Sequence, residues 1–300
     1  MRLLTFVREP DPTHRLGVLR DSDRIVDLWE FPRRFPCRLP FDPSDMVSLI
    51  VGGQDALDAV AAIVRKATPV SPVSSVRLLA PIPRPPKGVL CVGWNYLEHF
   101  AEADGIHRRG GDLPEHPTFF SKLATSVIGP YDNIPFDSAV SDQLDWEAEL
   151  AVVIGVGGRA IREDDAPRHI FGYTALNDLT ARDLQRAHGG QWLVGKGLDG
   201  SCPMGPWIVT TDELDPDDLG VTTRVNGIVK QESNTRHFYF KIPRLLAELS
   251  RGITLEPGDV LSTGTPQGIG FSRTPPEFLR PGDLLETEIT GIGTLRNPVR

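Results

Sequence analysis

Three carboxylates alternate along the stretch DWEAELAVVIG, in which Asp145, Glu147 and Glu149 occupy every second position. Alternate side chains of a β-strand point to the same side, so one face of this strand would carry all three acids. Neighbouring carboxylates repel by roughly 1 to 4 kcal/mol per pair at effective dielectric constants near 80 to 20. No lysine or arginine occurs between Asp137 and Arg159 to offset this charge locally. The pattern therefore indicates either an exposed edge strand or a face that binds a cation.

A third metal ligand is available in the segment YTALNDLTARDLQ, where Asp178 comes directly before an expected helix. An acid at a helix start also stabilises the helix dipole, so its position alone does not distinguish the two roles. Together with Glu147 and Glu149 it would form a site with oxygen ligands only. Such hard ligands suit Mg²⁺ or Mn²⁺, less specifically Ca²⁺, and not zinc.

Three further segments carry residues suited to acid–base chemistry or binding. In GWNYLEHFAEA, a helix would place His99 and Glu102 on one face, where the carboxylate can orient the imidazole as a general base; surface pairs share this spacing. Lys196 lies in the glycine-rich WLVGKGLDG, which is not a phosphate-binding loop because Gly197 follows the lysine. The loop around Thr265 could hold a substrate carboxylate through its backbone NH groups, or be an ordinary turn.

The elements that must position these residues divide the chain into three parts. Residues 1–68 hold short strand candidates and the helix candidate ALDAVAAIVRKA, which predict a small N-terminal α+β domain. Residues 69–86 contain six prolines and predict an extended connector. Residues 87–300 predict a β-rich catalytic domain with scattered helices. Because strands do not alternate regularly with helices there, a doubly wound parallel sheet is not favoured.

Within the larger part, helices are expected at NYLEHFAEA, LTARDLQRAH and IPRLLAELSRG. The second is expected to begin with a capping box between Thr180 and Asp183. Strands are expected at GVLCVGW, ELAVVIG, GPWIVT, TTRVNGIVKQ, GDVLSTG and GDLLETEI.

Composition excludes several classes of protein. The chain has 300 residues, of which 40% are hydrophobic and 24% charged, so it can bury a substantial core. Its net charge of −8 argues against nucleic acid or an anionic membrane as a partner. Cys37, Cys91 and Cys202 are widely spaced and suggest neither a disulfide framework nor a zinc site. No stretch resembles a signal peptide or a membrane helix, and we expect a cytoplasmic protein.

Taken together and in order, the motifs resemble the fumarylacetoacetate hydrolase family. The resemblance covers residues 87–300 and rests on GWNYLEHFAE, HPTFFSK, DWEAELAVVIG, NDLTARDLQ, WLVGKGLDGSCPMGPW, VNGIVKQ, ITLEPGDVLSTGTPQGIG and LRPGDLLETEITGIGTLRNPV. It implies a mixed β-sandwich roll preceded by a small N-terminal domain, and a homodimer. Trp94 departs from the small, aliphatic or arginine residues familiar at its position, which leaves the identity of the substrate open.

The resemblance also implies roles for individual residues. The positions that match Glu147, Glu149 and Asp178 bind a divalent metal, usually Mg²⁺, and those that match His99 and Glu102 form a catalytic dyad. The positions that match Gln185 and Lys196 contact the reacting carbonyl and its developing charge, so both are expected to be catalytic. The residues expected to bind the substrate are Lys122, Thr265, Asn95 and Tyr96, of which Lys122 would help to offset the charge of a bound oxo acid.

The expected activity is Mg²⁺-dependent hydrolysis of a carbon–carbon bond in a 2,4-dioxo acid, such as an acylpyruvate, through a stabilised enolate. His99, oriented by Glu102, would activate the attacking water. The alternative is decarboxylation or keto–enol isomerisation of a 2-oxo acid such as oxaloacetate at the same site. A non-catalytic metabolite-binding relative is a third possibility, disfavoured by the presence of His99, Glu102 and Lys196 together. The His99 helix and the loop at Gly110 and Gly111 are expected to form a mobile lid.

Overall fold

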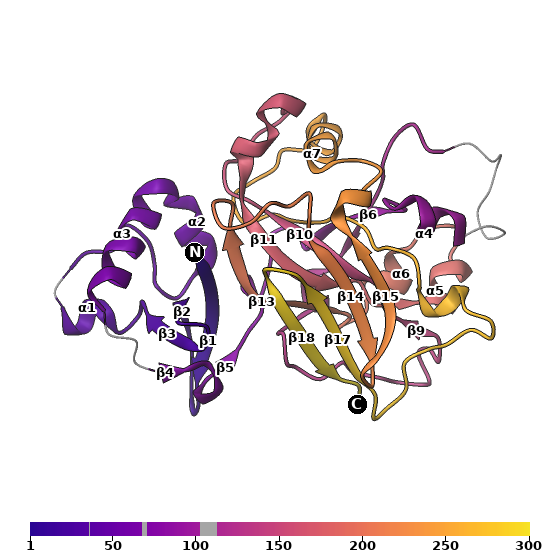
Figure 1. Ribbon diagram of the computed structural model, residues 1–300, viewed down its shortest axis with the longest axis horizontal. Coiled ribbons are helices and arrows are strands. Elements are labelled where there is room, and N and C mark those ends of the chain that lie inside the picture. Colours follow the sequence, from indigo (N-terminus) through magenta and orange to yellow (C-terminus); the bar gives the residue numbers. More distant parts are fainter. Residues whose placement is uncertain (36, 68–70, 103–112) are drawn as a thin grey trace.

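A mixed sheet of twelve strands is the largest element of the computed structural model, which describes residues 1–35, 37–67, 71–102 and 113–300. Its main path runs β4-β3-β2-β1-β13-β11-β10-β16-β6-β7 (Figure 1). Pairing is antiparallel except between β16 and β6 and between β13 and β8. The strands are β1 Arg2–Arg8, β2 Asp11–Arg20, β3 Arg24–Asp27, β4 Ser71–Pro72, β5 Arg77–Leu78, β6 Val89–Gly93, β7 Thr118–Lys122, β8 Val127–Ile128, β10 Ala148–Ile154, β11 Ile170–Asn177, β13 Cys202–Thr210 and β16 Val260–Ser262.

A second, four-stranded sheet packs against the first and confirms the β-rich α+β fold with a sandwich-like roll. Its order is β15-β14-β17-β18. Val221 and Ile289 from this sheet share one buried apolar cluster with Leu150 and Val152 of β10. Burial of apolar surface between the two sheets thus holds the layers together. The remaining strands are β9 Leu144–Asp145, β12 Thr180–Ala181, β14 Gly220–Val225, β15 Ile228–Asn234, β17 Leu284–Ile289 and β18 Gly293–Pro298.

The helices are short and lie outside the sheets (Figure 1). Within the described ranges, none is long and apolar enough to cross a bilayer. The expected capping box is wrong: α5 is preceded by Ala181 without a side-chain cap, Thr180 donates to the carbonyl of Asp178, and Asp183 accepts from Ser141. The α-helices are α1 Phe31–Arg34, α2 Met46–Val51, α3 Gly53–Lys66, α4 Leu97–Glu102, α5 Arg182–Ala187, α6 Leu193–Lys196 and α7 Ile242–Ser250. The 3-10 helices are η1 Val73–Ser75, η2 Ala124–Ser126, η3 Glu163–His169, η4 Thr235–His237 and η5 Gly270–Ser272.

The first eighty residues form a lobe at one side of the molecule (Figure 1). The large sheet nevertheless continues into this lobe, because β1 pairs with β13 through Leu3 and Ile208. The proline-rich segment contributes β4 and β5, which pair with β3 and β1. Leu3 of the lobe and Val153 of β10 belong to the same buried cluster. Backbone hydrogen bonds and apolar packing therefore both cross the predicted boundary between residues 68 and 87.

Candidate active site

The ends of two neighbouring strands bring the three predicted metal ligands together. Strand β10 begins directly after Glu147, and β11 ends directly before Asp178. The two strands are antiparallel and pair Ala148 with Asn177, so Glu147 and Asp178 lie opposite each other. The backbone NH of Asp178 donates to the carbonyl of Glu147 at 2.9 Å. One carboxylate oxygen from each of Glu147, Glu149 and Asp178 lies within 4.8 Å of the others.

Alternation along β10 explains why the acids share a face and are nevertheless buried. Ala151 and Val153 continue the face of Glu149 into one apolar cluster, whereas Leu150 and Val152 point into the other. Glu149 is only 1% exposed. The alternative of a solvated edge strand is therefore excluded, since β10 lies between β11 and β16 inside the sheet.

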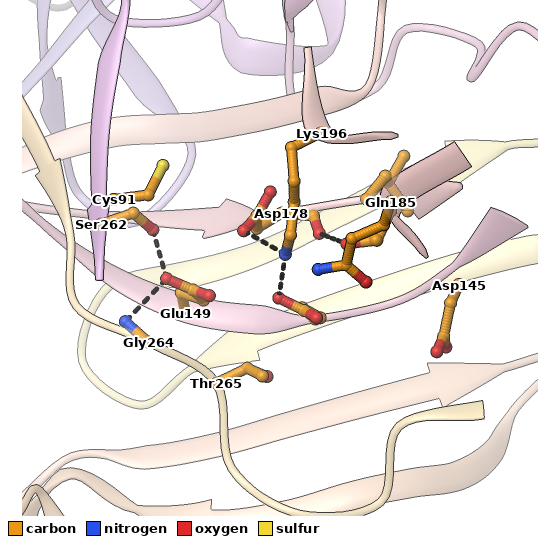
Figure 2. A network of polar contacts seen from close by, with 12 residues as sticks. Cys91, Asp145, Glu149, Asp178, Gln185, Lys196, Ser262, Gly264 and Thr265 are labelled. Atoms are coloured by element: carbon orange, nitrogen blue, oxygen red, sulfur yellow. Dashed lines mark hydrogen bonds and ion pairs between the residues drawn. The ribbon is translucent and has the colours of Figure 1, made fainter. Parts of the chain in front are cut away.

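Asp145 has a different role from the other two acids of the alternating run. Its carboxylate accepts hydrogen bonds from the backbone NH groups of Trp146, Gly270 and Phe271, and from the guanidinium of Arg182 at 2.8 Å. It lies apart from Glu149 in Figure 2. Asp145 thus holds the segment at Gly270 and Phe271 close to Arg182.

Three buried cations from distant segments offset the charge of the carboxylates. The ammonium group of Lys196 lies 2.7 Å from both Glu147 and Asp178 (Figure 2). Arg182 lies 2.7 Å from Glu147, and Lys122 lies 3.0 Å from Asp178. None of these residues is close to the acids of β10 in sequence. Local sequence therefore predicts the negative charge but not the cations that make its burial tolerable.

Glu147 and Glu149 experience different electrostatic environments. Burial alone would raise the pKa of Glu147, but Lys196 and Arg182 lower it to about 2. Burial, reinforced by the negative charges of Asp178 and Glu147, raises the pKa of Glu149 well above its ordinary value. Glu149 accepts hydrogen bonds from Ser262 at 2.5 Å and the NH of Gly264 at 2.7 Å, and no ion pair is seen for it within the described residues. A site with this uncompensated charge and only oxygen ligands fits a divalent cation.

The predicted dyad lines the same cavity as Glu147 and Glu149. On α4, Nδ1 of His99 is 3.4 Å from Oε2 of Glu102, and the other oxygen of Glu102 accepts from the NH of Gly268 at 2.6 Å. His99 is buried, and both residues line the cavity together with Glu147 and Glu149. In this structure the helix is thus docked over the carboxylates. Gly110 and Gly111 of the predicted lid lie outside the described residues.

Gln185 and Thr265 also line the cavity, where the sequence interpretation expects contacts with the substrate. Oε1 of Gln185 accepts from Arg182 at 3.2 Å, which leaves its amide NH₂ group able to donate into the cavity. The hydroxyl of Thr265 donates to the carbonyl of Ala148 and accepts from Gln231. Both side chains are therefore oriented by neighbours before any substrate binds.

Three other residues expected to contact the substrate are not among those that line the cavity. Lys122 is fully buried and donates to the carbonyls of Leu179 and Lys196 as well as pairing with Asp178. The side chain of Asn95 is fully engaged with backbone groups of Phe240 and Thr263, and Tyr96 is buried in the apolar core. In this geometry they support the cavity wall and do not face a ligand.

Sequence reasoning missed Arg182 and the aromatic wall of the cavity. Arg182 lies three residues before Gln185 on α5, a spacing that places both on one helical face and could have revealed it. Trp192 packs edge-to-face against Trp94 and Phe120, with ring centroids 4.8 and 5.1 Å apart. Glycine at position 93 leaves room for Trp192, because a Cβ there would lie 2.9 Å from its ring.

We expect replacement of Arg182 by methionine to lower the free energy of unfolding by about 3 kcal/mol, because it leaves the buried carboxylates of Asp145 and Glu147 short of a cation. Asp145 keeps three backbone NH donors, so we expect a loss at the lower end of the range for breaking a buried ion pair. Urea denaturation checks it, with Arg168→Met on the exposed η3 as the control. A variant as stable as the wild type would contradict this role of Arg182.

The fold and the site together define a class of β-rich enzymes in which two members of a buried carboxylate triad and a histidine–glutamate pair line one cavity. Comparison with known proteins identifies the family. The chain belongs to the fumarylacetoacetate hydrolase family, because the family model described as "Fumarylacetoacetate (FAA) hydrolase C-terminal" matches residues 88–300. The family includes enzymes that act as tautomerases, isomerases and hydrolases.

Several individual proteins resemble this chain over nearly its whole length. A mitochondrial oxaloacetate tautomerase from Xenopus laevis is 41% identical, over 100% of this chain and 90% of its own length. The oxaloacetate tautomerase YisK of Bacillus subtilis is 40% identical over 95% of both chains. The solved fumarylacetoacetate hydrolase of Exiguobacterium antarcticum is 39% identical with a TM-score of 0.83, over 100% and 99% of the two chains.

One solved relative bears on the metal. The maleylpyruvate hydrolase of Sphingobium sp. SYK-6, crystallised with manganese(II) and pyruvate, is 29% identical to this chain with a TM-score of 0.78. The match covers 100% of this chain and 98% of that one. Together with the buried acidic triad, this relative supports a divalent metal site in the present protein.

Proposed function

We propose that the protein is a metal-dependent tautomerase that interconverts the keto and enol forms of a short 2-oxo acid of the oxaloacetate type. The observation that carries this proposal is that two relatives at 40 and 41% identity, matched over at least 95% of this chain, are both named oxaloacetate tautomerases. This supports the isomerase alternative of the sequence analysis over carbon–carbon hydrolysis as the main activity.

The size of the cavity agrees with a short substrate. The space between Glu147, Glu149, the dyad and the aromatic wall is about 60 Å³, enough for a few water-sized groups. Trp94, Trp192 and Phe120 occupy the volume that a bulky distal group would need. With α4 docked as it is here, the site therefore favours an oxo acid of few carbons.

The residues of the chain suffice to move the proton in this reaction. Because Nδ1 of His99 faces Glu102, its Nε2 is the nitrogen available to take a proton from the carbon beside the keto group. The nearby ammonium of Lys196 stabilises the negative charge that develops on the keto oxygen. Return of the proton to that oxygen gives the enol, and no other atom is gained or lost. A divalent cation held by Glu147, Glu149 and Asp178, for which we propose Mg²⁺, would polarise the oxygens of the oxo acid.

Hydrolysis remains the second candidate because the maleylpyruvate hydrolase shares the fold and aligns over 98% of its length. Hydrolysis needs an ordered water between the dyad and the substrate, whereas tautomerisation needs only the proton transfer. The small cavity favours the reaction that needs no additional water beside the substrate, which supports tautomerisation as the first candidate.

The decisive measurement is the decay of the ultraviolet absorbance of enol-oxaloacetate. We expect the purified protein to accelerate it in the presence of Mg²⁺ or Mn²⁺, to lose this activity with a chelator and to regain it when metal is restored. Acylpyruvates tested in parallel should be cleaved slowly or not at all. Rapid acylpyruvate cleavage without any acceleration of enol decay would overturn the proposal in favour of hydrolysis.

A further inference from the structure

The cations close to the carboxylate triad are already committed to protein carboxylates. Lys196 pairs with Glu147 and Asp178, and Arg182 pairs with Asp145 and Glu147. A ligand with a second negative charge, remote from the reacting end, would therefore need a different partner.

Arg186 provides a cation that has no carboxylate partner in the described part of the chain. It lines the cavity from the last turn of α5 and is exposed. Among the described residues, no Asp or Glu oxygen lies within 4.0 Å of its guanidinium. Its hydrogen-bond partners are neutral: Nε donates to the carbonyl of Arg182 at 3.2 Å, and Nη2 donates to Oε1 of Gln143 at 3.2 Å. An unpaired arginine at the rim of a small cavity can attract an anion from solution.

The guanidinium of Arg186 is also held in place. It lies 4.7 Å from the ring centroid of Phe271, a cation–π contact. The backbone of Phe271 is in turn fixed by its hydrogen bond to Asp145. Two of the five N–H donors of Arg186 are used by acceptors among the residues that the structure describes, and with respect to these residues three remain for a ligand. Such a pre-oriented fork matches a carboxylate well.

We infer that Arg186 binds a second carboxylate at the end of the substrate remote from its 2-oxo acid group, and so makes the site selective for dicarboxylic 2-oxo acids. This inference rests on the proposed function and specifies its substrate class. The rest of the described outer wall offers mainly aromatic side chains, including Trp94, Phe120 and Trp192. Arg186 is thus the group best placed to distinguish a dianion from a monoanion.

The total charge of the site agrees with this assignment. The triad, Asp145 and Glu102 carry five negative charges, and Lys122, Lys196 and Arg182 carry three positive ones. A divalent cation would make the site neutral, and a dicarboxylate would bring it to two negative charges. Arg186 reduces this to one, which lowers the cost of enclosing two charges of the same sign in one cavity.

Calorimetry on the full-length Mg²⁺-loaded protein tests the inference through binding alone. The probes are oxaloacetate and its 4-methyl ester, which differ by the second negative charge. We expect the wild type to bind oxaloacetate roughly 10- to 100-fold more tightly than the ester, the range of a charged hydrogen bond at a partly exposed site. Arg186→Met should remove this preference by weakening oxaloacetate binding, with little change for the ester. Arg186→Lys should retain part of the preference, because it keeps the charge but loses the fork.

Two further measurements separate this role from a structural one. Raising the salt concentration should reduce the preference in the wild type but not in Arg186→Met, since an exposed cation is screened. Arg168→Met, on the distant and exposed η3, should behave like the wild type. Equal binding of the two probes by the wild type, or a preference that survives in Arg186→Met, would refute the inference. If enol decay is not accelerated but the binding preference follows Arg186, the proposed function fails and the dicarboxylate site stands.

Discussion

Replacing His99 by alanine should lower kcat for enol–keto exchange roughly 10²- to 10⁴-fold, the usual effect of losing a positioned general base. His99 is buried in the cavity, with Glu102 at 3.4 Å to orient its ring. His99 is not one of the residues that would bind the metal. The affinity for Mg²⁺ should therefore stay within about twofold of the wild type.

Stopped-flow absorbance gives kcat, and calorimetry gives the metal affinity. Glu102→Gln should reduce kcat less than His99→Ala, because the amide can still accept from the NH of Gly268 and remain near the imidazole. Glu98→Gln is the matched control, since Glu98 lies on the same helix and is exposed. If His99→Ala exchanged oxaloacetate at the wild-type rate, the dyad would have no part in proton transfer, and α4 would serve only to cover the cavity.

Glu149→Gln is expected to reduce Mg²⁺ affinity by more than about 100-fold and to remove activity with it, because the loss of a direct ligand should exceed that of an outer-shell partner. Its effect on the metal-free protein should be small or even stabilising. Glutamine can still accept from Ser262 and Gly264, and it has no charge for Glu147 and Asp178 to repel. Metal binding and folding stability should thus respond in opposite ways to one substitution.

Thermal unfolding with and without Mg²⁺ measures both effects, since a ligand at 100 times its Kd stabilises by about 2.7 kcal/mol. The variant should lose this metal-dependent increase in Tm. Glu147→Gln is the informative comparison, because it leaves Lys196 and Arg182 with one carboxylate fewer and should destabilise the metal-free protein by roughly 1 to 3 kcal/mol. Full retention of the Mg²⁺-induced Tm shift in Glu149→Gln would show that the triad is not the metal site.

Patterns that repeat within a few residues predicted the positions of many elements. The stretch around Glu149 correctly indicated a strand, although only Glu149 of the three alternating acids lies within β10, because Asp145 belongs to β9. The spacing of His99 and Glu102 correctly indicated one helical face. Burial of Glu149 was not predictable from that segment, because an exposed edge strand has the same local pattern. What buries it is the pairing of β10 on both sides, by β11 and by β16, which lies more than 100 residues away.

Arg182 escaped prediction for a related reason. It reaches Asp145 and Glu147 only because β9 pairs with β12, and this pairing brings the start of α5 beside the acids. Lys122 was expected as a site residue from the charge of a bound oxo acid, but its full burial beside Asp178 depends on the packing of β7. The expected capping box failed because Thr180 is itself a strand residue in β12. Tertiary pairing overrode the local helix signal there.

The pairing of β1 with β13 has a consequence for how the chain can be shortened. In the whole protein, β13 is covered along Ile208 and Val209 by the first residues of the chain. A fragment that began at residue 87 would leave this strand with unpaired NH and carbonyl groups along one side. Such an exposed, apolar strand edge pairs readily with a second molecule. We therefore expect β1 of the N-terminal lobe to prevent two molecules from pairing through the edge of β13. Engineered variants should retain at least β1 even where catalysis alone is of interest.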